Sequence, residues 1–213
     1  MKQRIIFVIK CILKIYFKLL NPLFNIEIGS SSYLINTKIS AKYRNNNSIL
    51  IGDNVSLKKC NFIFLGKNNK IIIKDGAKLE NVTFWLEDDF NLITIGNNTT
   101  FHGNCQLAAC EGCHINIGND CMFSHDIYVR TTDSHSIIKD NVRINLAKSI
   151  TIGNHVWIGM QTLILKGANI PDGCIIGARS IISSSIMKNK NSIYVGHPSK
   201  LIKKDIAWKR ERI

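Results

Sequence analysis

The sequence predicts an all-β solenoid, in which short parallel strands stack as successive coils, and three observations lead to this fold. First, a triplet of the form apolar-x-Ile recurs five times, at residues 49–51, 71–73, 93–95, 115–117 and 150–152. Second, the triplets follow one another in steps of 22, 22, 22 and then 35 residues. Third, glycine follows four of the five triplets and supplies a tight turn. Because a single coil cannot bury its own apolar face, the repeat predicts coils stacked around a continuous isoleucine core.

Length and composition favour one principal domain with a basic surface. The chain has 213 residues, of which 45% are hydrophobic, enough for one sizeable core. Lysine and arginine number 28 against 15 acidic residues, a formal net charge of +13, which favours an anionic partner such as a polysaccharide or a membrane. The basic residues are spread through turns and both termini and form no known nucleic-acid reader, so we expect no nucleic-acid partner.

The seven cysteines are odd in number and indicate reduced thiols in a cytoplasmic protein. The run Cys110-Glu-Gly-Cys113-His114 matches the C-x-x-C-H pattern of covalent haem attachment. That chemistry needs an exported chain, however, and the run falls inside the repeat. We therefore expect neither haem nor a bound metal here.

Residues 1–24 predict a basic amphipathic helix. Lys10, Lys14 and Lys18 recur every four residues within an otherwise apolar segment. The lysines interrupt the apolar region too often for a signal peptide or a comfortable membrane span. Two interpretations stay open: peripheral contact with the inner face of the cytoplasmic membrane, or a cap or subunit contact at the open end of the solenoid.

The solenoid domain is expected over residues 25–198, and its rhythm tightens to six-residue steps after residue 152. Residues 152–185 and the closing run Val195-Gly-His-Pro-Ser-Lys200 resemble the hexapeptide-repeat acyltransferases, in particular the sugar O-acetyltransferases of bacterial capsule, polysialic acid and lipopolysaccharide. The resemblance implies a left-handed parallel β-helix, a homotrimer with active sites at subunit boundaries, and acetyl-CoA as co-substrate with no permanently bound cofactor. Residues 25–114 match the family more loosely, as if one corner of each coil were looped.

The long step in the repeat predicts an extended loop near residues 131–147, because 35 − 22 leaves 13 extra residues before Ile152. This loop carries Asp133 and His135 in the run Thr-Asp-Ser-His-Ser. The resemblance implies that a loop histidine meets the acceptor hydroxyl, and an imidazole can take the hydroxyl proton as the thioester is attacked. We therefore expect His135 to be the general base in a direct transfer. Asp133 either orients it or only shapes the turn.

The remaining candidate site residues belong to the donor. The resemblance places Trp157 near the active centre, where its ring could pack against pantetheine or the acceptor sugar. Small residues would leave room for the pantetheine arm, and basic residues would bind the CoA phosphates. These are Gly159, Gly177 and Ala178, and then Arg179, Lys200 and Lys203. A backbone N–H between residues 157 and 159 is the candidate donor to the tetrahedral intermediate.

Residues 199–213 are predicted to form a short C-terminal helix that packs back on the coils. Apolar residues alternate there with charged ones, at Leu201, Ile202, Ile206 and Trp208. The resemblance implies a terminal helix at the same place.

The function expected from these observations is transfer of acetyl from acetyl-CoA to a hydroxyl of a bacterial surface polysaccharide. The net charge favours an acidic, sialic-acid-type capsule glycan as acceptor. The alternatives are an N-acetyltransferase of a nucleotide amino sugar, a xenobiotic acetyltransferase, a non-catalytic scaffold, and a zinc enzyme related to gamma-type carbonic anhydrases. The zinc enzyme would need three of its histidines to converge, from among His102, His114, His125 and His155.

Overall fold

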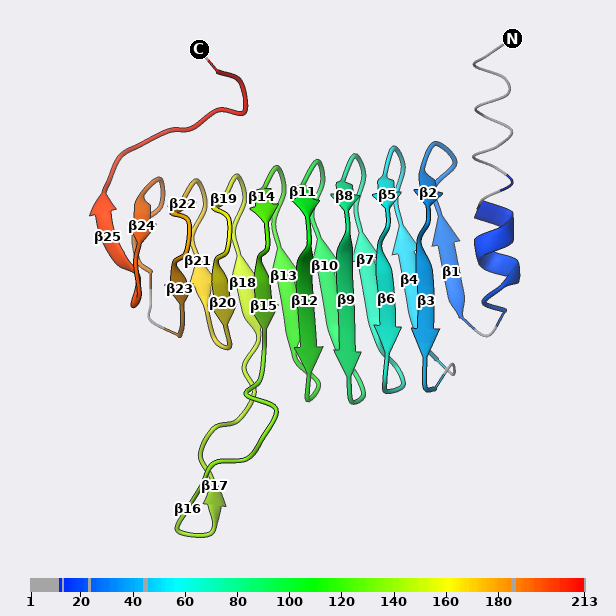
Figure 1. The fold of residues 1–213 in the computed structure, drawn as a ribbon, viewed down its shortest axis with the longest axis horizontal. Helices are drawn as coiled ribbons and strands as arrows, with labels where there is room; N and C mark the ends of the chain where they lie inside the picture. The colour runs from blue at the N-terminus through cyan, green and yellow to red at the C-terminus, as the bar shows by residue number, and fades with distance from the viewer. Residues whose placement is uncertain (1–11, 13, 23, 44–45, 185–186, 213) are drawn as a thin grey trace.

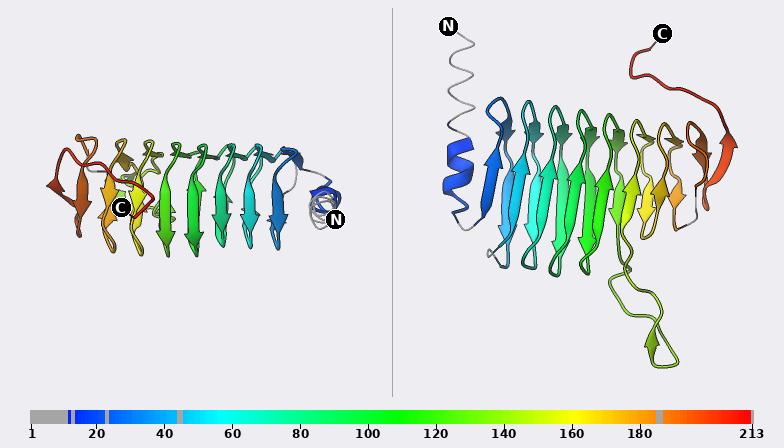
Figure 2. Two further views of the ribbon diagram at one scale, coloured as in Figure 1. Left: turned by 90° about the horizontal axis from the view of Figure 1, so that it is seen from above. Right: turned by 180° about the vertical axis from the view of Figure 1, so that it is seen from behind.

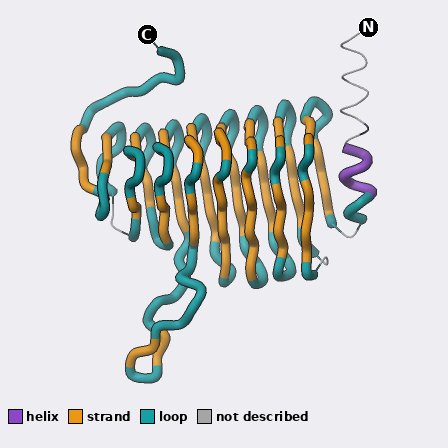
Figure 3. Tube along the Cα trace, in the orientation of Figure 1, coloured by secondary structure: helices purple, strands orange, loops and turns teal. Residues whose placement is uncertain are grey.

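A computed structural model of the chain describes residues 12, 14–22, 24–43, 46–184 and 187–212. Most of them form a parallel β-solenoid whose coils stack side by side along one axis (Figures 1 and 3). Among the described residues, seven coils each contribute one strand to each of three sheets, here called sheets A, B and C, and sheet B has two further strands, the last of them antiparallel. The all-β solenoid predicted from the repeat is confirmed.

The sheets follow the same order along the chain, and their strands are short. Sheet A contains β1 (Asn25–Ile28), β4 (Ser48–Ile51), β7 (Lys70–Ile73), β10 (Leu92–Ile95), β13 (His114–Ile117), β18 (Ile150–Ile152) and β21 (Asn169–Ile170). Sheet B contains β2 (Tyr33–Ile35), β5 (Ser56–Lys58), β8 (Lys78–Glu80), β11 (Thr100–Gly103), β14 (Met122–His125), β19 (Trp157–Ile158), β22 (Ile175–Ile176), β24 (Ile193–Val195) and β25 (Lys200–Lys203). Sheet C contains β3 (Lys38–Ala41), β6 (Asn61–Phe64), β9 (Val82–Glu87), β12 (Cys105–Cys110), β15 (Tyr128–Arg130), β20 (Leu163–Leu165) and β23 (Ile181–Ile182).

The isoleucine triplets set the register of sheet A. Ile71 pairs with Ile49 on one side and with Ile93 on the other, and Ile115 pairs with Ile150 across the long step. These side chains point inward and are fully buried. Aromatic rings continue the same stacking in the other sheets, where Phe62–Phe84 and Phe101–Phe123 have ring centroids 4.9 Å and 4.2 Å apart. The core is therefore a set of parallel apolar rows that no single coil could bury.

The early coils are longer than the late ones because of sheet C. Strands β9 and β12 have six residues each, whereas β20 has three. The corner after these long strands holds a buried asparagine ladder, in which Asn69 Oδ1 accepts from the Asn91 backbone N–H at 2.8 Å and Asn47 Oδ1 accepts from that of Asn69 at 2.9 Å. The ladder satisfies corner amides that no strand pairs. It also keeps the register of the looser repeats.

A short helix at residues 14–19 covers the open end of the first coil (Figure 1). Phe17 is buried against Phe62, with ring centroids 6.5 Å apart, and Lys14 Nζ donates to the Gly29 carbonyl at 2.9 Å. The helix therefore caps the solenoid through one face. Lys10 lies outside the described residues. No helix among the described residues is both long and apolar enough to cross a bilayer.

The predicted C-terminal helix is wrong for the described part of the tail. Residues 200–203 form strand β25, which pairs antiparallel with β24, and the chain then runs back over the coils without helical structure as far as residue 212 (Figure 1). Strand β24 offers an unpaired edge, and a segment with mixed apolar and charged residues satisfies that edge as a strand. Trp208 does pack on the coils, as its apolar side chain suggested, and is 7% exposed.

The long step in the repeat leaves the solenoid as a protruding arm between β15 and β18 (Figures 1 and 2). Its far end is an antiparallel hairpin of β16 (Ile138–Lys139) and β17 (Val142–Arg143). Sheet register continues beneath the arm, because β15 pairs with β20 and β13 pairs with β18. The extra residues therefore project outward and leave the stacked coils undisturbed.

Candidate active site

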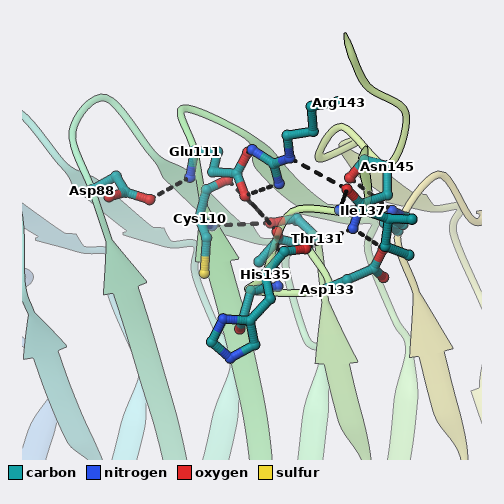
Figure 4. Close-up of polar contacts among 12 residues, drawn as sticks. Asp88, Cys110, Glu111, Thr131, Asp133, His135, Ile137, Arg143 and Asn145 are labelled. Carbon is teal, nitrogen blue, oxygen red and sulfur yellow. Dashed lines mark hydrogen bonds and ion pairs between the residues drawn. The ribbon is translucent and has the colours of Figure 1, made fainter. Parts of the chain in front are cut away.

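Asn145 organises the base of the arm, where the chain leaves and re-enters the solenoid. This side chain is 8% exposed and makes four hydrogen bonds, one of them accepted by Oδ1 from Arg143 Nε at 3.4 Å (Figure 4). Its Nδ2 donates to Asp133 Oδ2 at 2.9 Å and to the His135 carbonyl at 2.7 Å, and its Oδ1 accepts from the Ile137 backbone N–H at 2.7 Å. A single amide thus fixes the backbone on both sides of His135.

Asp133 is part of this framework. Its carboxylate forms an ion pair with Lys166, whose Nζ also donates to the Asn145 carbonyl at 3.0 Å. The hydrogen bonds from Lys166 and then Asn145 hold the pKa of Asp133 below its ordinary value, so the carboxylate is charged at neutral pH. Within the described part of the chain, its hydrogen bonds reach the backbone of His135 through Asn145 and do not include the imidazole.

The imidazole of His135 is exposed and points away from the polar cluster (Figure 4). Among the described residues, neither ring nitrogen has a hydrogen-bond partner. The backbone of this residue is held tightly while its side chain is free to meet a ligand. This arrangement suits a group that must receive a proton from a bound molecule.

A second anchor joins the arm to the preceding coil. Arg143 donates to both carboxylate oxygens of Glu111, at 2.7 Å and 2.8 Å, and the Thr132 hydroxyl donates to Glu111 at 2.6 Å (Figure 4). Hydrogen bonds from Arg143 and then Thr132 lower the pKa of Glu111. In the sequence, Glu111 stands out only as part of the C-x-x-C-H run. Its true partners lie 21 and 32 residues away, a distance that no local pattern reveals.

The C-x-x-C-H run is a turn between β12 and β13, and Cys110 is buried. Burial, and then the nearby Glu87 carboxylate, raise the pKa of the Cys110 thiol to about 12. This thiol therefore stays protonated and acts as a small apolar side chain. Cys113 is also unbridged.

Trp157 marks a different part of the surface. It begins β19, lies between Met122 and Ile175 in the outer row of sheet B, and is 38% exposed. The backbone N–H groups of Trp157 and Gly159 donate to the next coil at 2.9 Å and 2.8 Å. Both amides are thus already paired, and neither is free to serve the tetrahedral intermediate as the sequence analysis suggested.

The small residues near Trp157 are required by the packing of adjacent coils. A Cβ on Gly159 would come within 2.6 Å of the Ala178 nitrogen, and one on Gly177 within 2.5 Å of a Val195 methyl group. Arg179 follows in the same turn, is exposed, and donates from Nε to Gln161 Oε1 at 2.8 Å. The structure therefore brings Gly159, Ala178 and Arg179 into one corner of the solenoid.

Lys200 and Lys203 lie at the two ends of β25, and Lys200 pairs with Val195, whose side chain borders Gly177. Both lysines are exposed, on the final strand of sheet B. They extend the basic surface at the C-terminal end of the solenoid. In a single chain, no hydrogen bond, ion pair or ring contact among the described residues joins this end, or the Trp157 corner, to His135.

The C-terminal tail packs beside Trp157, which the sequence did not indicate. Trp208 stacks on His155 with ring centroids 4.0 Å apart, and its ring centroid is 6.1 Å from that of Trp157. His155 Nδ1 also lies 2.7 Å from Asp120 Oδ2, and Arg210 Nε donates to the other Asp120 oxygen at 2.9 Å. Burial alone would raise the pKa of Asp120, but the bonds from His155 and Arg210 outweigh it and lower that pKa.

The histidines considered for zinc do not converge. His155 is occupied by the tail, and His125 pairs with its neighbour Asp126 at 2.8 Å. Within the described part of the chain, no three histidine, cysteine or carboxylate side chains cluster as metal ligands would. The arrangement gives the zinc-enzyme hypothesis no geometric support.

Comparisons with known proteins identify the relatives of this solenoid. No family model matches the sequence. A polysialic acid O-acetyltransferase of Neisseria meningitidis is 34% identical over 188 residues, which cover 87% of this chain and 86% of the relative. The chain belongs to the hexapeptide-repeat acyltransferases. The family predicted from the sequence is therefore confirmed, and the chain is an acetyl-CoA-dependent O-acetyltransferase.

Solved structures agree with this acyltransferase assignment. The crystal structure of the polysialic acid O-acetyltransferase OatWY superposes with a TM-score of 0.83 at 31% identity, over 90% of each chain. The polysialic-acid-specific acetyltransferase NeuO superposes with a TM-score of 0.64 at 25% identity, over 89% of this chain and 90% of its own. The solenoid is thus the left-handed β-helix of this acyltransferase family.

The Glu111–Arg143 anchor generates a prediction about the arm. Because the pKa of Glu111 is depressed below its ordinary value of 4.5, its stabilising contribution is complete above that pH and is lost as the pH falls through the lower, folded-state value. We expect amides of residues 137–144 to stay protected from hydrogen exchange at pH 5 and to lose protection on further acidification. Glu111→Gln should remove the protection already at pH 7.

A matched control is Asp140→Asn, which alters an exposed carboxylate at the hairpin tip. Hydrogen exchange of the core strand β13 reports whether the solenoid itself is intact. Unchanged protection of the arm in Glu111→Gln would show that the ion pair does not hold it.

Proposed function

We propose that this acyltransferase O-acetylates a hydroxyl of a sialic-acid-type capsule glycan. The observation that carries the proposal is the near full-length similarity, in sequence and in fold, to proteins named polysialic acid O-acetyltransferases. The formal net charge of +13 supports an acidic polymer as acceptor. The exposed histidine on a rigid arm supports transfer to a hydroxyl.

In this mechanism His135 is the general base and transfer is direct. The acceptor hydroxyl donates its proton to the imidazole as its oxygen attacks the thioester carbonyl of acetyl-CoA. The C–S bond then breaks to leave the acetyl ester, and the imidazolium gives the proton to the sulfur so that CoA leaves as the thiol. The ring of His135 is free for this task because Asn145 binds only its backbone. Asp133 contributes by fixing the arm through Lys166 and Asn145, as a positioning residue.

The donor is proposed to lie along the Trp157 corner. The ring of Trp157 offers an exposed face for pantetheine. The coils approach closely at Gly159, Gly177 and Ala178, which leaves a narrow surface along which the extended pantetheine chain can lie. The CoA phosphates would meet exposed cations on the following turn and strand. These are Arg179, Lys200 and Lys203.

The active site is proposed to form between the subunits of a homotrimer. In one chain the arm and Trp157 extend from different sheets, and the arm exposes apolar side chains that suit burial against a neighbour. Ile138, Val142, Ile144 and Leu146 are each more than half exposed. A neighbouring subunit that covers them would bring its Trp157 to this chain's His135.

Subunit complementation tests the shared site. His135→Ala and Trp157→Ala chains should each be inactive alone and should recover activity when co-expressed, because some boundaries then carry one intact histidine and one intact tryptophan. Sedimentation of the wild type should give the mass of three chains. Co-expressed variants that stay inactive, with trimers formed, would place both residues of each site in one chain.

The catalytic role of His135 is tested by thiol release from acetyl-CoA, with acidic and neutral bacterial glycans as acceptors. Wild type should turn over on a sialic-acid polymer, and His135→Ala should be at least about 100-fold slower with CoA binding unchanged. His114→Ala, which removes an exposed histidine from sheet A, is the matched control and should behave as wild type. Full activity in His135→Ala would rule this residue out as the base.

We also propose a cytoplasmic location at the inner face of the membrane, with contact through residues 1–24. The capping helix buries Phe17 but leaves apolar side chains and Lys18 facing outward. An outward face of this kind suits the interface of an anionic bilayer. The exposed apolar members are Ile12, Ile15, Tyr16, Leu19 and Leu20.

Co-sedimentation with anionic phospholipid vesicles tests the membrane contact. Wild type should bind, and bind less as salt rises, whereas Ile15→Asp with Leu19→Asp should reduce binding at least about tenfold. Ile202→Asp, an exposed apolar position on β25, is the control and should bind as wild type. Equal binding by all three proteins would contradict contact through this helix.

A further inference from the structure

The side chains of Arg130, Arg143 and Lys166 meet the base of the arm, and two of these three cations are neutralised within the chain. Arg143 is paired with Glu111, and Lys166 with Asp133. The third, Arg130 at the end of β15, has no carboxylate within ion-pair distance among the described residues. A guanidinium is charged at all relevant pH values and prefers a carboxylate that it can grip with two N–H groups. The positive charge of Arg130 is therefore not balanced by a carboxylate in the described part of the chain.

The hydrogen bonding of Arg130 is also incomplete. Its Nη1 donates to the Tyr128 hydroxyl at 2.8 Å, and its Nη2 donates to the Ser134 hydroxyl. Its Nε is buried without a hydrogen-bond partner in the described structure. A buried N–H that bonds to nothing costs free energy, so this nitrogen indicates a missing acceptor. The two neutral hydroxyls hold the guanidinium in place without cancelling its charge.

The position of Arg130 relates it to the reaction. Ser134, which accepts from the guanidinium, is the residue directly before His135. Along the outer face of sheet C, Arg130 pairs in register with Ala108, and Ala108 with Trp85. Ala108 is buried, at 1% exposure, whereas Arg130 is half-buried. A groove of about 280 Å³ on the same sheet is lined by Gln106, Asp126 and Tyr128, and Tyr128 accepts a hydrogen bond from Arg130.

We propose that Arg130 binds the carboxylate of the sugar residue whose hydroxyl is acetylated. This inference rests on the proposed function, because a sialic-acid-type polymer carries one carboxylate on each residue. Nη1 and Nη2 each carry a second N–H beyond the one donated to a hydroxyl, and these two form the pair of donors that a carboxylate takes. Binding there places the sugar ring beside Ser134 and hence within reach of the histidine that follows it. Arg130 is thus a specificity residue for an acidic acceptor.

The test compares Arg130→Gln with wild type on a sialic-acid polymer and on the same polymer with its carboxylates reduced to alcohols. On the acidic polymer, Arg130→Gln should raise the acceptor KM about 10- to 100-fold and leave the KM for acetyl-CoA unchanged. On the reduced polymer, the two proteins should have equal kcat/KM. Arg130→Lys keeps the positive charge but loses the planar pair of N–H donors. Its acceptor KM on the acidic polymer should therefore lie between those of wild type and Arg130→Gln.

Lys78→Gln is the matched control, since it removes an exposed cation from β8 in another sheet and should change neither KM. Equal loss by Arg130→Gln on both polymers would assign Arg130 a purely structural role. A raised KM for acetyl-CoA would assign it to the donor phosphates, and wild-type kinetics would assign it no role. A wild type inactive on both polymers, yet active on another glycan, would instead overturn the proposed acceptor. Thermal melting of each variant confirms that it is folded.

Discussion

The register of the stacked coils determines the rest of the structure. Each inward isoleucine of sheet A lies directly beside the same position of the next coil, so a shift of one residue would turn the whole row outward. The buried asparagine ladder holds that register where the coils are longer than the hexapeptide ideal. With the register fixed, an insertion can only project outward, which is how the arm comes to leave after β15 while β13 and β18 stay paired.

The arm is held by polar contacts, in contrast to the apolar core that supports it. Asn145, Glu111 and Asp133 tie its two ends to the coils, and Asn145 binds the backbone around His135 while leaving the imidazole free. A framework of this kind restricts where the side chain can be without occupying its nitrogens. The tail acts similarly at the other part of the site, where Trp208 and Arg210 pack next to Trp157. Both regions combine a rigid support with one exposed functional ring.

The repeat predicted the fold because stacking depends on local spacing, and local spacing is visible in the sequence. The strands at the isoleucine triplets, the later hexapeptide strands and the long step before Ile152 all appear as expected. The tail was predicted wrongly as a helix, since its strand exists only because β24 offers an edge. The contacts around His135 escaped prediction for the same reason. Arg143 and Glu111 are 32 residues apart, and Trp208 and His155 are 53 apart, so only the fold brings them together.

The reaction proposed for this chain passes an acetyl group from acetyl-CoA to a sugar hydroxyl of an acidic glycan. The most direct measurement is an NMR spectrum of a sialic-acid polymer after incubation with the protein and acetyl-CoA labelled with carbon-13 in the acetyl group. We expect labelled O-acetyl esters on the sugar ring, equal in amount to the thiol released. Thiol release without label in the polymer, or label found only in amides, would contradict it.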